Sequence, residues 1–473
     1  MRMEQRPNIL LITADHWPGH MLGIEGHPCI QTPTLDALAG SGRRFVRAYS
    51  ESPLCVPARR ALMTGRAPTV DAPAVDCTRL ADAFSAGGYQ TYAVGKLHTK
   101  PQRSRLGFDD VQLCEEGRTK WRVIDDYEAY LAQEGHAGEQ FLHGMGNNEY
   151  VNRTWHLPED LHVTNWMTRQ MVRTIQRRDP TRPALWYLSY THPHPPLVPL
   201  PFYWHMYRDL PVATPSVGSW AENPEAVPRA LRARRERGER FSDYAVRAAR
   251  RAFYALSTHI DHQLRVVIGT LRESGILDNT VILFTSDHGD MLGKHGLWAK
   301  TLYYEESARV PMLLVGASNG QAIENGSVDD RLVGWQDVMP TLLELAGLPV
   351  PASVEGLSML GNARRTELYG EIGRGQRATR MIHTGRFKLI YYPAGNEVQL
   401  FDLQEDPEEL TDLAGDPAWR GQRDQMEALL AVRLRGEDRT WVREGRLVGM
   451  PFVASDGRGD KGLSSQRGVH WPL

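Results

Sequence analysis

The chain has 473 residues, enough for one large domain and a smaller one. Its composition is that of a soluble globular protein, with 41% hydrophobic and 24% charged residues. Lysine and arginine number 55 against 57 acidic residues, and the resulting net charge of -2 argues against a general nucleic-acid or membrane binder. The 17 histidines direct attention to metal binding and acid–base chemistry.

The first residues predict no cleaved leader. The apolar run at residues 9–12 is too short for a signal-peptide core, and no later stretch has the length of a membrane span. We therefore expect a cytoplasmic protein that binds neither membranes nor nucleic acid. The four cysteines are irregularly spaced and form no C-x-x-C pair, which indicates neither a disulfide framework nor a zinc site.

Apolar runs alternate with helical patterns over most of the chain. Strands are predicted at residues 8–12, 89–94, 184–190 and 281–285, and helices at residues 34–39, 81–86 and 241–273. Strands that are apolar on both faces and separated by helices predict an α/β domain with a large, mostly parallel sheet sandwiched by helices. The charge run at residues 229–240 is typical of a solvated helix face.

The pattern changes after Gly356. Two strand-like runs, residues 386–392 and 399–403, flank a turn and predict an antiparallel hairpin. We therefore expect a catalytic domain over residues 1–365 and a smaller C-terminal α+β subdomain with an antiparallel sheet over residues 366–473. The glycine-rich tail after Leu447 is expected to be extended, and it leaves a homo-oligomer open because it is long enough to reach a neighbouring copy.

Four predicted strands end on histidine, aspartate or lysine. Ligands of parallel sheets gather beyond the carboxyl ends of the strands, so these residues are expected to share one site. They are Asp15-His16, the run Lys96-Leu97-His98, the pair His192 and His194, and Asp287-His288.

Two of these ends carry adjacent acid–imidazole pairs, Asp15-His16 and Asp287-His288. Two carboxylates and two imidazoles suit one divalent ion, provided that the strands are neighbours. In the competing interpretation the aspartates cap helices and the histidines bond to the backbone. Oxygen ligands suit Ca²⁺ or Mg²⁺ and imidazoles favour Mn²⁺, so we expect Ca²⁺ or Mn²⁺ without choosing between them.

The run Cys55-Val56-Pro57-Ala58-Arg59 resembles the C-x-P-x-R signature of type I, formylglycine-dependent sulfatases of the alkaline phosphatase superfamily. A lone C-x-P-x-R is a weak signal, but five further matches follow in family order. They are the run from Gly88 to His98, Pro193-His194-x-Pro196, the run from Thr285 to Asp290, His295-Gly296-Leu297-Trp298-x-Lys300, and Leu400-Phe401-Asp402-Leu403 with Asp406-Pro407. The resemblance implies an alkaline-phosphatase-like fold.

The resemblance also implies the chemistry. A formylglycine-generating enzyme oxidises Cys55 to formylglycine, which hydrates to a gem-diol. One diol oxygen ligates the metal and attacks sulfur, and the other lets the covalent intermediate collapse and release sulfate. Residue 55 is therefore expected to be both the nucleophile and a metal ligand, in addition to the two acid–imidazole pairs.

The other matched positions receive roles from the same resemblance. Arg59 pins the diol, and Lys96 and Lys300 grip the sulfate oxygens. His98 takes the diol proton during collapse, and His194 helps to protonate the leaving group. Taken singly, both lysines would instead be solvated surface charges, and His194 would only order a loop between prolines. No role is assigned to His192, and His295 remains open between a structural and a catalytic role.

The pair Asp15-His16 departs from the family, in which many members have two consecutive aspartates. Replacement of the second aspartate by glutamine is familiar in relatives that act on choline sulfate or phosphonate monoesters, which places this chain nearer those branches. The leading prediction is hydrolysis of a small-molecule sulfate monoester. The alternative is a phosphonate monoester or phosphodiester hydrolase with the same nucleophile and metal, and a remote third is a non-catalytic binding protein.

No motif defines the residues that recognise the alcohol half of the substrate. The loop-like composition between Cys114 and Val151 predicts an insertion near the mouth of the site. Its aromatic and imidazole side chains suit an apolar or a cationic leaving group, and they are Trp121, Tyr127, Tyr130 and His143.

Overall fold

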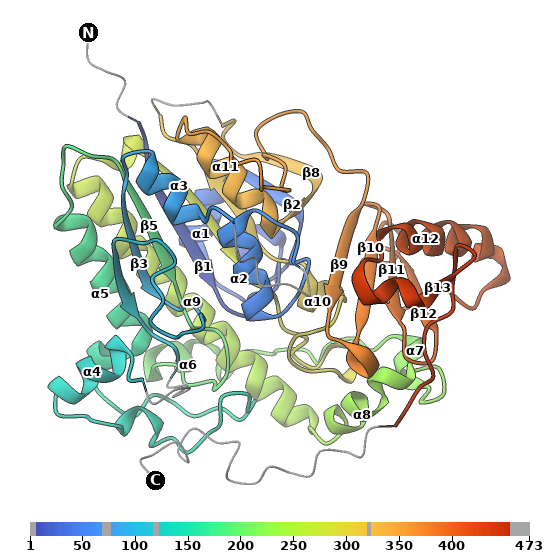
Figure 1. Ribbon diagram of the computed structural model, residues 1–473. Coiled ribbons are helices and arrows are strands. Elements are labelled where there is room, and N and C mark those ends of the chain that lie inside the picture. Colours follow the sequence, from blue (N-terminus) through green and yellow to red (C-terminus); the bar gives the residue numbers. More distant parts are fainter. Residues whose placement is uncertain (1–5, 69–76, 117–122, 319–322, 455–473) are drawn as a thin grey trace.

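The computed structural model describes residues 6–68, 77–116, 123–318 and 323–454. An eight-stranded sheet forms the main body and a four-stranded sheet lies to one side of it (Figure 1). Trp121 and most of the predicted tail lie outside the described residues. The large sheet has the order β4-β3-β5-β1-β6-β7-β2-β8 and consists of β1 (Asn8–Ala14), β2 (Arg43–Tyr49), β3 (Gln90–Gly95), β4 (Asp110–Leu113), β5 (Ala184–Ser189), β6 (Thr280–Ser286), β7 (Met312–Val315) and β8 (Ser327–Gly334).

The large sheet is mostly parallel, which confirms the predicted fold class. Only β7 runs antiparallel to its neighbours, β6 and β2. Strand β1 lies between β5 and β6, and Thr13 is in register with Ser189 on one side and with Thr285 on the other. The carboxyl ends of β5, β1 and β6 therefore meet at one edge of the sheet.

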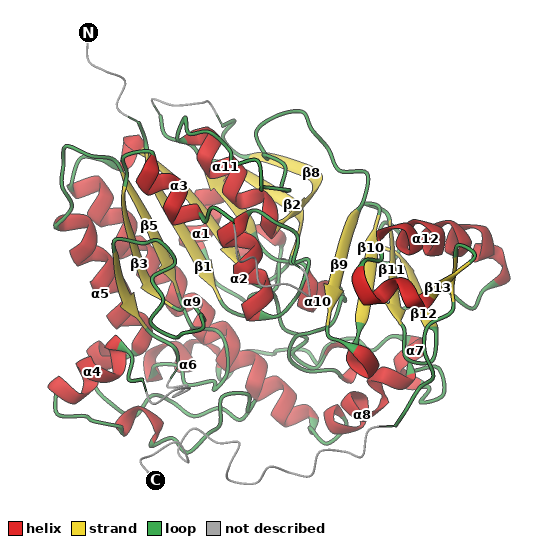
Figure 2. Cartoon of the chain, in the orientation of Figure 1, coloured by secondary structure: helices red, strands yellow, loops and turns green. Residues whose placement is uncertain are grey.

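Helices cover both faces of this sheet (Figure 2), as the alternating pattern predicted. One face packs against α1 (Pro33–Gly40), α5 (Val163–Gln176) and α9 (Asp243–Glu273). The other packs against α2 (Cys55–Thr64), α3 (Leu80–Ala86) and α11 (Val338–Leu345). Successive residues of β1 alternate between the two cores, with Leu10 and Ile12 facing the first and Ile9 and Leu11 the second.

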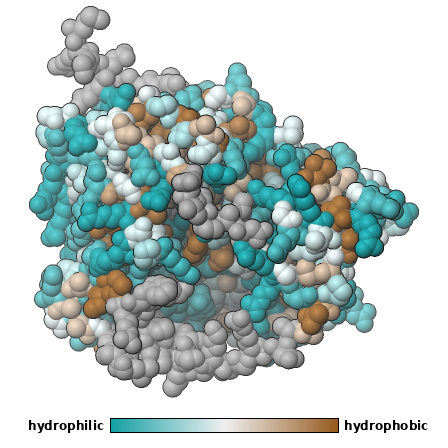
Figure 3. Space-filling model, in the orientation of Figure 1, coloured by the Kyte–Doolittle hydropathy of each residue, from teal (hydrophilic) through white to brown (hydrophobic). Residues whose placement is uncertain are grey.

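Five short helices lie in the connections. They are α4 (Asp126–Gln133), α6 (Pro201–Tyr207), α7 (Ser219–Glu222), α8 (Arg229–Gly238) and α10 (Glu305–Ala308). None of the described helices combines the length and the apolarity that crossing a membrane requires. On the face shown in Figure 3, hydrophilic side chains cover most of the surface and apolar residues form small separate patches.

The small sheet is antiparallel, with the order β12-β11-β10-β9. Its last two strands form the predicted hairpin, paired from Phe387 with Asp402 to Tyr392 with Glu397. One face packs against α12 through Met426 and Leu430, and the other joins the main body through a core that includes Trp220. The small sheet consists of β9 (Leu368–Ile372), β10 (Thr379–His383), β11 (Phe387–Tyr392) and β12 (Glu397–Asp402). Helix α12 (Arg420–Arg433) and the short strands β13 (Val442–Arg443) and β14 (Arg446–Leu447) follow it.

Because β6 is a central strand that carries site residues at its end, its packing is expected to dominate stability. The Leu283 side chain is fully buried, so L283A should lower the free energy of unfolding by about 2–5 kcal/mol through lost contacts and a cavity. Urea denaturation followed by circular dichroism measures the change. The control V432A removes a side chain that is 84% exposed on α12 and should stay within about 0.5 kcal/mol. Equal effects of the two substitutions would contradict this assignment of the core.

Candidate active site

The candidate site lies at the carboxyl edge of the large sheet. Asp15 follows β1, Asp287 follows β6 and Lys96 follows β3, while His194 lies five residues beyond β5. Cys55 enters from the other direction as the first residue of α2, after the extended residue Leu54. The strand order therefore brings together groups as distant in the chain as Asp15 and Asp287, which are 272 residues apart.

The two acid–imidazole pairs converge because β1 and β6 are directly paired, with Ala14 opposite Ser286. Ligand atoms of one buried group lie within 4.8 Å of one another: Asp15, Cys55, Asp287 and His288. The Cys55 Sγ lies 3.3 Å from His288 Nε2 and 3.8 Å from Asp15 Oδ1. Four of the five predicted metal ligands thus form one group.

The fifth, His16, lies beside this group rather than within it. One of its ring nitrogens lies within 4.8 Å of ligand atoms of Asp15 and His194. Its Nδ1 lies 2.6 Å from Asp290 Oδ2, and because a carboxylate only accepts, this nitrogen carries the proton. In the neutral ring the Nε2 lone pair therefore faces the Lys300 ammonium, 2.6 Å away. Burial and the nearby Lys300 hold the pKa of His16 well below its usual range.

His288 has the same tautomer as His16. Its Nδ1 lies 2.9 Å from the Gly289 carbonyl oxygen and donates to it, so Nε2 faces Cys55 and Asp15. Burial opposes a proton on Nε2, but Asp287 and Cys55 raise the pKa of His288 above its usual value. A cation bound here would replace that proton and use the lone pair of the neutral ring. A histidine whose outer nitrogen is bound to a carbonyl or carboxylate is the usual arrangement of an imidazole metal ligand. The donor set at the centre therefore fits a divalent cation.

Asp287 supports the same conclusion. Its Oδ1 is buried and accepts no hydrogen bond from the described residues, whereas its Oδ2 accepts from Arg59 Nε at 3.0 Å. Burial and the adjacent Asp15 carboxylate raise the pKa of Asp287 to about 7, against the opposing effects of His288 and Arg59. A cation bound at Oδ1 would use this oxygen and would offset the effects of burial and of Asp15 on the pKa.

Arg59 is buried beneath the group and joins three strands. Its Nη1 donates to the Lys96 carbonyl oxygen at 2.8 Å, to Ser189 Oγ at 2.6 Å and to the Tyr187 hydroxyl at 3.1 Å. Together with its bonds to Asp287, these contacts use most of the guanidinium donors. The contacts of Arg59 thus hold the floor of the site in place.

Both predicted lysines reach the Cys55 thiol. Lys300 Nζ lies 3.0 Å from Sγ, and Lys96 Nζ lies 3.9 Å from it. Lys96 is fully buried, forms an ion pair with Asp15 and lies 3.2 Å from Glu116 Oε1. Burial and Asp15 raise the pKa of the Cys55 thiol, but Lys300, Lys96 and His288 outweigh them and bring it well below its usual value. Neither lysine is the solvated surface charge of the competing interpretation.

The two predicted acid–base histidines differ in position. His194 is buried with its ring 4.1 Å from that of His16, and its Nδ1 donates to the Pro195 carbonyl oxygen at 2.6 Å. Burial lowers the pKa of His194 well below its usual range, although Glu116 opposes the shift. His98 is half-buried, belongs to neither ligand group, and is held through its backbone N–H to Glu115 Oε1 at 2.6 Å.

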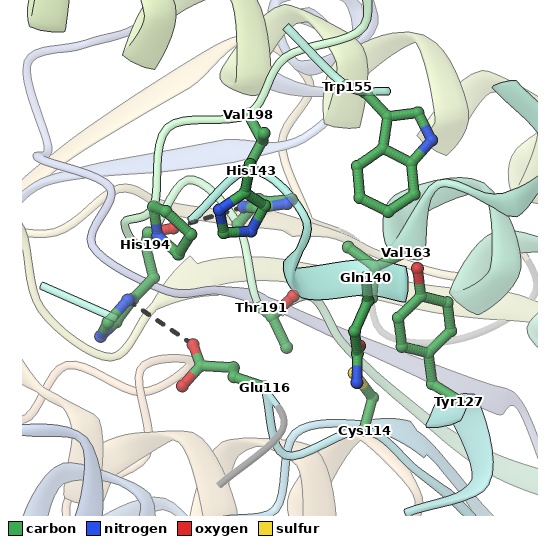
Figure 4. A pocket seen from close by; sticks show the side chains of 12 residues that line it. Cys114, Glu116, Tyr127, Gln140, His143, Trp155, Val163, Thr191, His194 and Val198 are labelled. Carbon is green, nitrogen blue, oxygen red and sulfur yellow. Dashed lines mark hydrogen bonds and ion pairs between the residues drawn. The ribbon is translucent and has the colours of Figure 1, made fainter. Parts of the chain in front are cut away.

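A recess of about 40 Å³ opens beside His194 (Figure 4). Two side chains of the predicted insertion, Tyr127 and His143, line it, whereas Tyr130 packs against Trp166. Glu116 lies at its inner end, 3.6 Å from His194 Nδ1. The other lining residues are Cys114, Gln140, Trp155, Val163, Thr191, His192, Pro196 and Val198.

The sequence patterns missed several residues that hold this site. Glu116 follows β4 by three residues, a strand-end acid of the kind that singled out Asp15. Asp290 lies within a recognised motif but received no role, and it accepts hydrogen bonds from both His16 and the Tyr150 hydroxyl, the latter at 2.5 Å. Tyr187 lies inside an apolar strand, where no local signal marks it.

His295, left open by the sequence, lies outside the site. It is buried against Trp220 and Tyr304, and its Nδ1 accepts from the Gly218 backbone N–H at 3.1 Å. Its ring lies in a second buried group, apart from Cys55, in which one ligand atom each of His295, Glu306 and Glu409 lie within 4.8 Å of one another.

The fold and the site define a hydrolase of the alkaline phosphatase superfamily. Residues 7–348 match the family model Sulfatase, and residues 293–435 match the model N-sulphoglucosamine sulphohydrolase, C-terminal. The chain therefore belongs to the sulfatase family, whose members are sulfuric ester hydrolases that generally use a metal ion and a formylglycine. The resemblance inferred from the six motifs is confirmed.

Relatives on both sides of the sulfate–phosphonate division are similar to the chain. An arylsulfatase of Clostridium perfringens is 33% identical over 469 residues, covering 94% of this chain and 97% of the relative. A choline-sulfatase of Rhizobium meliloti is 30% identical, covering 92% and 90%. The crystal structure of a phosphonate monoester hydrolase of Agrobacterium radiobacter superposes with a TM-score of 0.78 at 25% identity, covering 90% of this chain and 95% of that one.

Metal binding at Asp287 Oδ1, which accepts no hydrogen bond from the described residues, can be tested without measuring turnover. At a free Ca²⁺ or Mn²⁺ concentration of a hundred times Kd, the native state should gain about 2.7 kcal/mol of stability, measured as a rise in Tm that EDTA reverses. Asp287→Asn should abolish the rise. Asp110→Asn, at an exposed position on β4, is the control and should keep it. Equal stabilisation of Asp287→Asn would exclude Asp287 as a ligand.

Proposed function

We propose that the chain hydrolyses sulfate monoesters with a formylglycine made from Cys55 and one divalent ion. The observation that carries the proposal is the surroundings of Cys55. Its Sγ lies among the ligand atoms of Asp15, Asp287 and His288 and has two ammonium groups beside it, at 3.0 and 3.9 Å. The proposed nucleophile at position 55 therefore lies next to a candidate cation site and next to two ammonium groups that can bind an anion.

The proposed ligands are Asp15, Asp287, His288 and the side chain at position 55, with His16 next to them. An ion in this position supplies Lewis-acid stabilisation and favours a deprotonated hydroxyl on the formylglycine diol. Arg59 keeps Asp287 in place, and the Gly289 carbonyl oxygen keeps the His288 lone pair turned inward. Ca²⁺ and Mn²⁺ both remain candidates because the set mixes oxygen and imidazole donors.

Lys96 and Lys300 are the proposed sulfate clamps. Their Nζ atoms approach Cys55 from the β3 end and from the loop after β6, so a sulfate in contact with residue 55 is within reach of both. Preorganised cations stabilise the charge that develops on the sulfuryl oxygens. We assign His98 to the diol proton, although its backbone and not its ring has the described contact with Glu115.

His194 is the proposed proton donor to the leaving group, and its neutral ring must take up that proton as the sulfate anion binds beside it. The recess next to His194 is proposed to take the alcohol half of the substrate. Tyr127, Trp155 and Val163 give the recess an apolar wall. Such a wall suits an apolar or a cationic alcohol. His194 lies between the recess and His16, where the ester oxygen of the bound substrate is expected.

A phosphonate monoester is the second candidate substrate. The neutral His16 replaces an aspartate that many family members have, so the cluster has one negative charge fewer. Phosphonate and sulfate monoesters both carry a single negative charge, so this change alone favours neither of them. The similarity to the phosphonate monoester hydrolase supports this alternative, and the arylsulfatase and choline-sulfatase relatives support the first.

The proposal also includes a partner and a location. A formylglycine-generating enzyme must act on Cys55 before the chain folds around it, because the folded thiol is 2% exposed. Cys29, Cys55 and Cys114 are free thiols, which agrees with a reducing compartment and therefore with the cytoplasm.

Removal of the nucleophile is the direct test of this function. Cys55→Ala should lower kcat/KM for 4-nitrophenyl sulfate by on the order of 10⁴-fold or more, since no other group forms the covalent intermediate. Mass spectrometry of the wild-type peptide should show the aldehyde in place of the thiol. C114A, which removes a buried cysteine of the recess wall, is the control for loss of a thiol as such and should keep turnover within about 10-fold.

The same experiment separates the two substrate classes. With one aryl group on both esters, the sulfate should be turned over faster than the phosphonate. A higher kcat/KM for the phosphonate, again abolished by Cys55→Ala, would replace the first function with the second. Full activity of Cys55→Ala on both esters would contradict the mechanism itself.

A general acid at His194 predicts a dependence on the leaving group. H194A should lower kcat/KM for an alkyl sulfate by about 10²–10⁴-fold, because a poor leaving group needs the proton. The loss on 4-nitrophenyl sulfate, whose phenolate leaves unaided, should be less than about 10-fold. General damage to the site would lower both equally, so equal losses would count against this role. Steady-state kinetics on the two esters decides it.

A further inference from the structure

Helix α8 connects to the site through one arginine. This arginine-rich helix lies beside α7 and the small sheet (Figure 1), and several of its side chains are exposed. Arg234 is half-buried and reaches the segment that carries Lys300. Its Nη1 donates to Thr301 Oγ1 at 2.7 Å, and its Nη2 donates to the carbonyl oxygens of Lys300 at 2.6 Å and Trp298 at 3.3 Å.

The segment needs such support because its backbone is strained. The residues on both sides of Lys300 have left-handed conformations, with φ of 64° at Ala299 and 71° at Thr301. Residues other than glycine seldom adopt this region, and they remain in it only where the surroundings determine the conformation. Without these contacts the backbone at positions 299–301 is expected to relax and to carry the Lys300 side chain with it.

The backbone amides of the segment are already held from the opposite side. The Ala299 N–H donates to Asp290 Oδ1 at 3.2 Å, and the Thr301 N–H donates to the Pro53 carbonyl oxygen at 2.9 Å. The Ala299 carbonyl oxygen accepts from the Met291 N–H at 3.0 Å, and Arg234 takes the carbonyl oxygens of Trp298 and Lys300, so amides and carbonyls of the segment are both held. Asp290 also holds His16, whose Nε2 lies 2.6 Å from Lys300 Nζ. Asp290 therefore supports both His16 and the segment that carries Lys300.

We propose that Arg234 is a positioning residue that fixes the Lys300 ammonium against residue 55. The inference rests on the proposed function in so far as Lys300 grips the sulfate. Arginine suits the task because its planar fork reaches three acceptors at once, whereas a lysine has one ammonium. Arg232 on the same helix bonds instead to the carbonyl oxygens of Val227 and Glu225, away from the site.

The test compares Arg234→Met, Arg234→Lys and the control Arg232→Met by kcat/KM on 4-nitrophenyl sulfate. Arg234→Met should lose about 10- to 100-fold, the usual effect of a displacement near 1 Å at a catalytic group. Arg234→Lys should lose less, and Arg232→Met should stay within about 2-fold. In a Lys300→Met background, Arg234→Met should cause no further loss, because the group it positions is gone.

A second measurement does not depend on turnover. Hydrogen exchange of a peptide that spans residues 298–302 should be faster in Arg234→Met and unchanged in Arg232→Met. Multiplicative losses in the double variant, or unchanged exchange in Arg234→Met, would overturn the proposal. If Lys300→Met alone keeps wild-type kcat/KM, the proposed sulfate clamp fails instead, and the exchange rates still decide whether Arg234 holds the segment.

Discussion

Two aspartates on neighbouring strands are forced together at the centre of this protein. Asp15 and Asp287 end the paired strands β1 and β6 and are both fully buried. Two buried carboxylates repel each other and lose their hydration, so they require cations close by. Lys96 pairs with Asp15 and Arg59 with Asp287, and the remaining oxygen of Asp287 is left for a metal ion. This electrostatic requirement explains why Lys96 and Arg59 are buried next to the two aspartates.

The groups around Asp15 and Asp287 also determine what can bind and react at position 55. Lys96, which pairs with Asp15, also borders Cys55, and Lys300 approaches the same thiol, so a group at position 55 meets two ammonium groups. Two histidines turn their lone pairs inward because Asp290 and the Gly289 carbonyl oxygen hold their other nitrogens. Such an arrangement is preorganised for a tetrahedral oxyanion, such as the sulfuryl group of a sulfate ester.

The parts of the site differ in how rigidly they are held. Three of the proposed ligands, Asp15, Asp287 and His288, stand at strand ends, whereas Lys300 stands in a loop with left-handed residues on both sides. Contacts from outside the sheet, including those of Arg234, compensate for this difference. The recess beside His194 is made from the connection after β4 and from the loop after β5. The residues proposed to recognise the alcohol therefore lie on connecting segments, apart from the proposed metal ligands, as expected when a rigid sheet carries variable loops.

Local sequence determined the strands with continuous apolar runs, such as β1 and β6, and the chemical groups at their ends. It did not reveal β2, whose arginines break the apolar run, or β7, which has only four residues. Nor did it identify Glu116, Tyr187 and Tyr150, because their partners are distant in the chain. Only the tertiary structure decided that His16 lies beside the four-ligand group and that Arg234 supports Lys300. The reason is physical: a residue's type and neighbours set its local conformation, but the order of the strands in the sheet sets which ends meet.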